Sequence, residues 1–206
     1  LREDYAAFVC RLREALNAEG KPVVAALAPK TSAQQRGLLY EAHDYTLLSK
    51  AANAVFLMTY EWGYVYGEPQ AIAPLPQVRA VLDYALSVTA GENIFLGAPL
   101  YAYDWPLPYE KGRTRAETFS SQAAVARARL VGAEIEFDET ARSPCYHYFD
   151  KMRREHVVWF EDARSLRAKI ALAAEKGLQG IGFWQAGREL AQAWPLLDAL
   201  VTLETL

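Results

Sequence analysis

Apolar and polar positions along this chain follow one another in blocks that predict helices and strands in regular succession. Apolar residues recur every three or four positions between Asp4 and Ala18, as on one face of a helix, and Gly20 follows. Shorter apolar runs without that spacing predict buried strands. The strands are expected at 21–28, 54–60, 92–99 and 179–184, with further helices at 44–52, 77–87, 162–177 and 189–203. We expect Pro195 to kink or break the last helix.

The segment 111–160 interrupts this succession. It predicts a helix at 121–130, a strand at 134–137, and a hairpin of strands 146–149 and 156–160 joined by a charged, solvated turn. We therefore expect an α/β fold with a parallel sheet in 1–110, a small α+β insertion in 111–160, and a closing helix–strand–helix segment in 161–206. A complete (β/α)8 TIM barrel typically needs about 250 residues, so the pattern predicts half of such a barrel.

Composition narrows the class of protein. The chain is 52% hydrophobic and 23% charged, which predicts a globular fold, and its net charge of −3 favours neither nucleic acid nor an anionic membrane as partner. No apolar run has the length of a membrane span, and no targeting signal is present. Residue 1 is not Met, so we expect a processed or excised piece. Cys10 and Cys145 could form one disulfide, although two free thiols are the safer expectation.

Side chains suited to binding follow three predicted strands at their carboxyl ends, where α/β enzymes hold their sites. Aromatic faces stack on sugar rings, and hydroxyls and carboxylates bond sugar hydroxyls, so this set favours a carbohydrate. No Gly-rich phosphate loop is present and the three histidines lack metal-ligand spacing, so we expect neither a metal nor a cofactor. The candidates are Met58, Tyr60, Glu61, Trp62, Tyr101, Tyr103, Asp104, Trp105, Trp184 and Gln185.

Each candidate, taken alone, also has a purely structural interpretation. A single tryptophan such as Trp62 or Trp184 is more often a core or surface aromatic than a sugar platform. Met58 suits the filling of a barrel interior, and Glu61 and Asp104 could be solvated loop charges. The spacing of apolar residues does not decide between these interpretations.

Three ordered segments resemble glycoside hydrolase family 18, the chitinase-like hydrolases. Met58-Thr59-Tyr60-Glu61 resembles the Met-x-Tyr-Asp motif of barrel strand six, with Glu in place of Asp. The segment 96–105 resembles the Gly-x-Pro-x-Tyr…Trp segment of strand seven, and 180–185 resembles the strand-eight segment whose Trp floors the sugar site. Within the family, 60–63, 103–105 and 159–165 resemble the spore-cortex and spore-coat N-acetylglucosaminidases.

This resemblance implies strands five to eight of a TIM barrel, with the insertion between strands seven and eight. It implies hydrolysis of β-1,4-linked N-acetylglucosamine polymers, either peptidoglycan of the spore cortex or a chitin-like polymer, by a substrate-assisted retaining reaction. Tyr60 would position the acetamido group, Trp184 would floor the sugar, and the other candidates would contact or orient it. The family also implies a cis Trp184–Gln185 bond and a place in the spore coat, in the cell wall or outside the cell.

The family's acid motif, Asp-x-x-Asp-x-Asp-x-Glu on strand four, is absent from this chain. We therefore expect the parent protein to be a family 18 glycosidase (EC 3.2.1 type) and this 206-residue chain to be inactive alone. The N-terminal half of the same barrel is the expected partner, and open sheet edges could also support self-association. The alternative is a non-catalytic, chitinase-like carbohydrate-binding protein.

Overall fold

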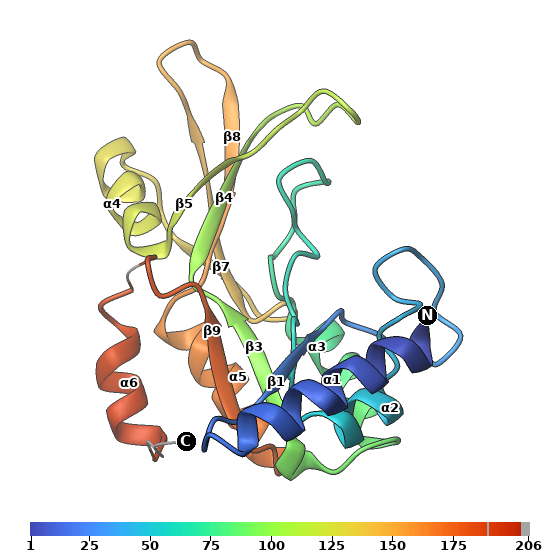
Figure 1. The fold of residues 1–206 in the computed structure, drawn as a ribbon. Coiled ribbons are helices and arrows are strands. Elements are labelled where there is room, and N and C mark those ends of the chain that lie inside the picture. The colour runs from blue at the N-terminus through green and yellow to red at the C-terminus, as the bar shows by residue number, and fades with distance from the viewer. Residues whose placement is uncertain (189, 203–206) are drawn as a thin grey trace.

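Two sheets organise the fold in this computed structural model, which describes residues 1–188 and 190–202 (Figure 1). The first is a four-stranded parallel sheet in the order β1-β2-β3-β9, which confirms the predicted strands and their parallel pairing. Its strands are β1 (Val24–Leu27), β2 (Ala54–Leu57), β3 (Ile94–Pro99) and β9 (Gly180–Trp184). The accompanying helices are α1 (Arg2–Asn17), α2 (Tyr45–Ala51), α3 (Leu75–Leu86), the short 3-10 helix η1 (Gly91–Asn93), α5 (Ala163–Glu175) and α6 (Ala193–Leu200).

The second sheet is antiparallel, five-stranded, and extends away from one end of the first (Figure 1). Its order is β5-β4-β8-β7-β6, and α4 (Ser121–Val131) packs against one of its faces. The predicted helix and hairpin of the insertion are confirmed, while the proposed boundaries at 110 and 160 stay a prediction. The strands are β4 (Tyr101–Pro106), β5 (Glu117–Ser120), β6 (Glu136–Asp138), β7 (Ser143–Phe149) and β8 (Glu155–Trp159).

One prediction about this region was wrong. We expected Tyr101 to Trp105 to lie in a loop after the third strand, but they form β4. Only Leu100 separates β3 from β4, so the chain passes from the parallel sheet into the antiparallel sheet within one residue. The side chains of β4 therefore start at the carboxyl edge of the parallel sheet.

The strand β2 ends at Leu57, three residues earlier than predicted, because the chain turns there. The Thr59 hydroxyl donates to the Gly97 carbonyl at 2.6 Å, and the Tyr60 N–H donates to the Met58 carbonyl at 2.8 Å. These bonds replace the ladder that a longer strand would have formed. Residues 60–62 consequently turn across the edge of the sheet.

The last helix also differs from the prediction. It begins at Ala193, so Pro195 lies in its first turn, where a missing N–H costs nothing, and the predicted kink was wrong. The predicted ends of this helix, Glu189 and Leu203, lie outside the described residues.

The half-buried Phe56 of β2 lies over two glycines, Gly97 on the adjacent β3 and Gly182 on β9, the strand after that. A Cβ on Gly182 would lie 2.5 Å from a carbon of the Phe56 ring, and a Cβ on Gly97 would lie 2.9 Å from it. Real Cβ atoms essentially never approach so closely. Glycine is therefore required at 182 while the ring lies there, and at 97 also because the backbone carbonyl of Leu57 lies even closer to the position of a Cβ.

A buried ion pair fixes the return of the chain from the second sheet to the first. Lys169 Nζ donates to Glu161 Oε2 at 2.8 Å, and neither side chain has exposed surface. Asp162 then caps α5 by accepting bonds from the N–H groups of Arg164 and Ser165. Burial raises the pKa of Glu161, and the ammonium of Lys169 opposes that rise.

Breaking this pair from one side should strongly destabilise the fold. For Lys169→Met we expect the free energy of unfolding to fall by about 3–5 kcal/mol, because Glu161 would stay buried without its partner. Urea unfolding measures the change. The control is Lys176→Met, whose pair with the half-exposed Asp83 should contribute less than about 1 kcal/mol. Equal losses in the two variants would contradict the role of the buried pair.

Candidate functional site

A cluster of Glu61 and two tyrosines lies at the carboxyl edge of the parallel sheet. Tyr103 Oη donates to Glu61 Oε1 at 2.8 Å and lies 3.1 Å from Oε2, while Tyr101 Oη donates to the same Oε1. The two phenol rings meet edge to face, with centroids 5.4 Å apart. The structure thus brings together three predicted site residues from two different segments.

The backbone at Glu61 directs this carboxylate toward β4. Its φ of 71° lies in the left-handed region, which is uncommon for residues other than glycine and clusters at functional sites. The loop that follows closes on itself, since the N–H groups of Trp62 and Gly63 donate to the carbonyls of Ile72 and Ala71 at 3.1 and 3.0 Å. Glu61 is therefore held by its own side-chain bonds and by a closed loop.

The tyrosines around Glu61 are hydrogen-bond donors at neutral pH. Burial, followed by the charge of Glu61, raises the pKa of Tyr60 to about 12. Burial, together with the bonds and charge of Glu61, also raises the pKa of Tyr101 and of Tyr103. All three phenols therefore keep their protons at neutral pH, and each can donate to a carboxylate or to a carbonyl oxygen.

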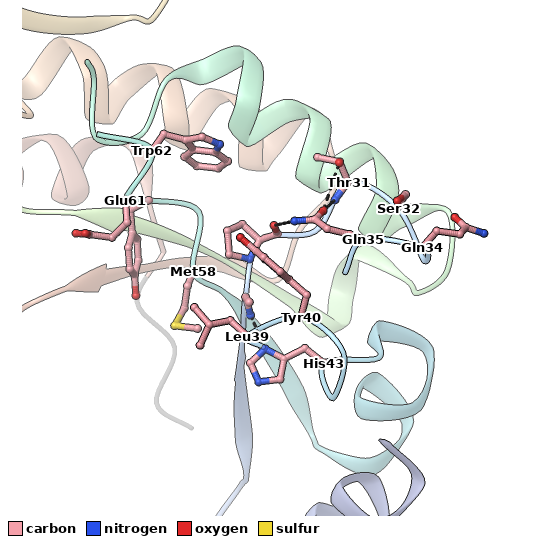
Figure 2. A pocket seen from close by; sticks show the side chains of 13 residues that line it. Thr31, Ser32, Gln34, Gln35, Leu39, Tyr40, His43, Met58, Glu61 and Trp62 are labelled. Atoms are coloured by element: carbon pink, nitrogen blue, oxygen red, sulfur yellow. Dashed lines mark hydrogen bonds between the residues drawn. The ribbon is translucent and has the colours of Figure 1, made fainter. Parts of the chain in front are cut away.

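A cavity of about 630 Å³ opens between the ends of β1 and β2. Four predicted residues line it, namely Met58, Tyr60, Glu61 and Trp62. Figure 2 shows Trp62 and Tyr40 reaching the cavity from different segments, while the carboxylate of Glu61 points away from Gln34 and Gln35. The rest of the lining was not predicted and belongs to the segment that follows β1: Ala28, Pro29, Thr31, Ser32, Gln34, Gln35, Leu39, Tyr40 and His43.

Hydrogen bonds to the backbone hold this missed segment in place. The Ala28 N–H donates to His43 Nδ1 at 2.8 Å, and the buried Lys30 Nζ donates to the carbonyls of Tyr40 and His43 at 3.3 and 3.2 Å. Burial, followed by the charge of Lys30, lowers the pKa of His43. Since Nδ1 accepts, the neutral imidazole carries its proton on Nε2.

Trp184 and Gln185 lie at the same edge of the sheet but outside the lining of this cavity. The Trp184 side chain is 54% exposed, and its carbonyl accepts from the Leu100 N–H at 2.8 Å. The Trp184–Gln185 peptide bond is cis, as predicted. The exposed indole is available for stacking.

Asp104 and Trp105, which were predicted to contact or orient the sugar, are buried in the structure. Trp105 has no exposed area, and Asp104 is 2% exposed. The Asp104 carboxylate accepts from Arg127 Nη1 at 2.5 Å and from Tyr148 Oη at 2.6 Å, and it lies 2.7 Å from His156 Nδ1. Successive residues of a strand point to opposite faces, so Asp104 lies on the α4 side while Trp105 packs with Tyr103.

In the part of the chain that the structure describes, no group of three or more His, Cys, Asp or Glu side chains is arranged to hold a metal ion. No helix there is both long and apolar enough to cross a membrane. Cys10 and Cys145 are free thiols, as expected.

A match to a sequence profile decides the family of this chain. The profile of Glycosyl hydrolases family 18 matches residues 2–189. The chain belongs to glycosyl hydrolase family 18. Its α/β fold of mixed sheets and helices is that of solved members. The Bacillus cereus spore cortex-lytic enzyme SleL superposes with a TM-score of 0.93 and 41% identity over 98% of this chain and 46% of that one.

Further relatives agree with this family assignment. The cortical fragment-lytic enzyme of Bacillus subtilis (strain 168) is 46% identical over 197 residues, which is 96% of this chain and 46% of that protein. The chitinase of Chromobacterium violaceum, at 24% identity and a TM-score of 0.87 over 96% of this chain and 61% of that one, shares the fold. This chain thus spans about half the length of the family 18 relatives from Bacillus.

The raised pKa of Tyr60 predicts how stability depends on pH. Between pH 10 and about 12 the unfolded chain releases this proton while the folded chain retains it, so the free energy of unfolding falls as the pH rises through this window. Urea unfolding across the range should show a shallower fall for Tyr60→Phe. Tyr64→Phe, at an exposed ring of the neighbouring loop, is the control. Equal slopes for wild type and Tyr60→Phe would contradict the assignment.

Proposed function

We propose that this chain holds the N-acetylglucosamine ring at the scissile bond of a family 18 glycosidase whose catalytic acid lies outside the chain. The observation that carries this proposal is the clamp of Glu61 by Tyr101 and Tyr103 at the edge where Trp184 exposes its indole. An aromatic platform beside fixed hydroxyl and carboxylate groups suits a sugar ring. Met58, Tyr60 and Trp62 would add contacts from the neighbouring cavity, and Gln185 from the end of β9.

The proposed substrate is a β-1,4-linked polymer that contains N-acetylglucosamine. Similarity to a cortical fragment-lytic enzyme and to a spore cortex-lytic enzyme supports spore-cortex peptidoglycan, and a chitin-like polymer is the broader class. The same similarity supports action at the spore cortex. Apart from Glu61, the side chains that line the cavity are uncharged, and several are aromatic or carry hydroxyl groups, which is consistent with an uncharged sugar.

The proposed reaction is substrate-assisted and proceeds with retention. The acetamido oxygen attacks the anomeric carbon while the glycosidic bond breaks, and the upstream Glu gives its proton to the leaving oxygen. Water then attacks the anomeric carbon of the oxazolinium intermediate and returns a proton to that Glu. Tyr60, protonated at neutral pH, would donate to the acetamido oxygen and hold it for attack, while Glu61 keeps the neighbouring tyrosines in place.

The proposal also includes completion of the sheet as half of a TIM barrel. The outer strands of the parallel sheet are β1 and β9, and the helices that precede β1 and follow β9 in the chain carry large exposed apolar side chains. Phe8 and Leu12 of α1 are 53% and 38% exposed, and Trp194 of α6 is 72% exposed. Outer strand edges together with exposed apolar side chains favour a partner. The N-terminal half of the barrel, with the strand that carries the acid, is the proposed partner.

The sugar site can be tested by removing the indole at the edge of the sheet. We expect Trp184→Ala to weaken binding of an N-acetylglucosamine tetramer by about five- to tenfold, because aromatic stacking contributes roughly 1 kcal/mol. Isothermal titration calorimetry measures the affinity. Trp194→Ala, another exposed tryptophan, is the matched control and should bind as wild type does. Unchanged affinity in Trp184→Ala would remove this edge from the proposed site.

The dependence on an upstream acid can be tested by complementation. We expect the 206-residue chain alone to release no reducing ends from cortex peptidoglycan, and to do so when co-expressed with the first four strands of a family 18 barrel. The control carries Gln in place of the acid Glu of that segment. Binding without cleavage in the complemented pair would favour the non-catalytic, lectin-like alternative. Cleavage by the chain alone would contradict the location of the acid, and light scattering would reveal self-pairing.

A further inference from the structure

We propose a second saccharide-binding site on the antiparallel sheet, centred on Trp159. Two cavities, of about 420 and 260 Å³, lie on either side of this residue, and both are lined by Trp159 and Pro69. We call them together the Trp159 groove. The proposal extends the proposed carbohydrate function to a place on the surface outside the clamp of Glu61.

The pairing of the strands explains why Trp159 faces the groove. Trp159 is opposite Tyr103 of β4 and Cys145 of β7, and residues directly opposite in antiparallel strands point to the same face. Trp159 therefore shares the face of the Glu61 clamp and packs against the cluster that contains Tyr101 and Tyr103. The loop 62–72 packs on the inner part of this face through Val65 and Ile72, and Pro69 in that loop lines both cavities.

The chemistry of the lining selects the class of ligand. Carboxylates, amides and hydroxyls surround the half-buried indole, and among the described lining residues neither cavity contains Lys or Arg. A groove without cations disfavours phosphate and other anions, whereas an aromatic face among mixed donors and acceptors suits an uncharged N-acetylated sugar. The polar and aromatic groups that the proposal uses are Glu68, Tyr109 and His147 in the larger cavity, and Gln77, Asp138 and Thr140 in the smaller one.

The side chains of the larger cavity are held before any ligand arrives. His147 Nδ1 lies 3.0 Å from Glu155 Oε1, and Tyr109 Oη donates to the Tyr66 carbonyl at 3.0 Å. The Leu107 N–H donates to the Glu155 carbonyl at 2.8 Å, which anchors the end of β4 to β8. Groups fixed in this way lose less conformational freedom on binding.

The Trp159 groove is separate from the cavity beside Glu61. The two share no lining residue, and the loop 62–72 contributes Trp62 to one and Pro69 to the other. A polymer long enough to contact both would bind the second site as an intramolecular event, which raises its overall affinity. The groove would thus retain the polymer, with no part in bond cleavage.

Fluorine NMR of the chain labelled with 5-fluorotryptophan tests the proposal directly, because the protein has five tryptophans. The Trp159 resonance is assigned from Trp159→Phe, and the probe is a β-1,4-linked N-acetylglucosamine tetramer. We expect this resonance to shift saturably in the wild type and in Trp184→Ala. The double change Glu68→Gln with His147→Gln, which leaves Trp159 in place, should weaken that shift by about fivefold. Glu92→Gln, on η1, is the matched control and should behave as wild type does.

The outcomes separate this inference from the proposed function. A Trp184 resonance that shifts while that of Trp159 does not would overturn the second site and leave the first. A Trp159 shift with no response at Trp184 would support the groove and contradict the site at the edge. A tetramer that moves neither resonance would overturn both. A shift unaffected by the double change would also overturn the groove as described.

Discussion

The hydrogen bonds that Tyr101 and Tyr103 donate to Glu61 join the two sheets at the candidate site. Glu61 follows β2 of the parallel sheet, whereas Tyr101 and Tyr103 belong to β4 of the antiparallel sheet. The single residue between β3 and β4 leaves the second sheet little freedom to move away from this edge. The carboxylate and the short connection together hold β4 against the carboxyl edge of the parallel sheet, and the tyrosines can donate to Glu61 as long as they remain protonated.

The parallel sheet could be predicted because its strands appear as short apolar runs between helices, even though only β2 and β3 are largely buried while β1 alternates between exposed and buried residues. The strand β4 was missed although its aromatic residues alternate with Ala102 and Asp104. The carboxylate of Asp104 suggested that its face of β4 is exposed to solvent, yet Asp104 is buried beneath α4. Its partners Arg127, Tyr148 and His156 are 23, 44 and 52 residues away in the sequence, so no local pattern could reveal that they satisfy it.

The candidate site, like the fold, was predicted only in part. Residues after β2 and β9 were recognised because aromatic and acidic side chains directly follow apolar runs there. The segment after β1 supplied none of the predicted site residues, although the carboxyl end of β1 lies at the same edge of the sheet as those of β2 and β3. Its shape depends on Lys30, a lysine buried against backbone carbonyls, and sequence alone predicts an exposed ammonium at such a position.

The ring of Phe56 links two positions that lie two strands apart in the parallel sheet. Because it occupies the space above Gly182, a methyl group there displaces it, and a smaller side chain at 56 removes the reason for glycine at 182. Gly97, on the strand between them, is different, because the Leu57 carbonyl requires glycine there whatever residue stands at 56. Among homologues, the identities at 56 and 182 should therefore covary although they are distant in sequence. Anyone who redesigns this sheet should exchange these two residues together and keep glycine at 97, since a glycine, which is a poor strand former by itself, is favoured at 182 only beneath the ring.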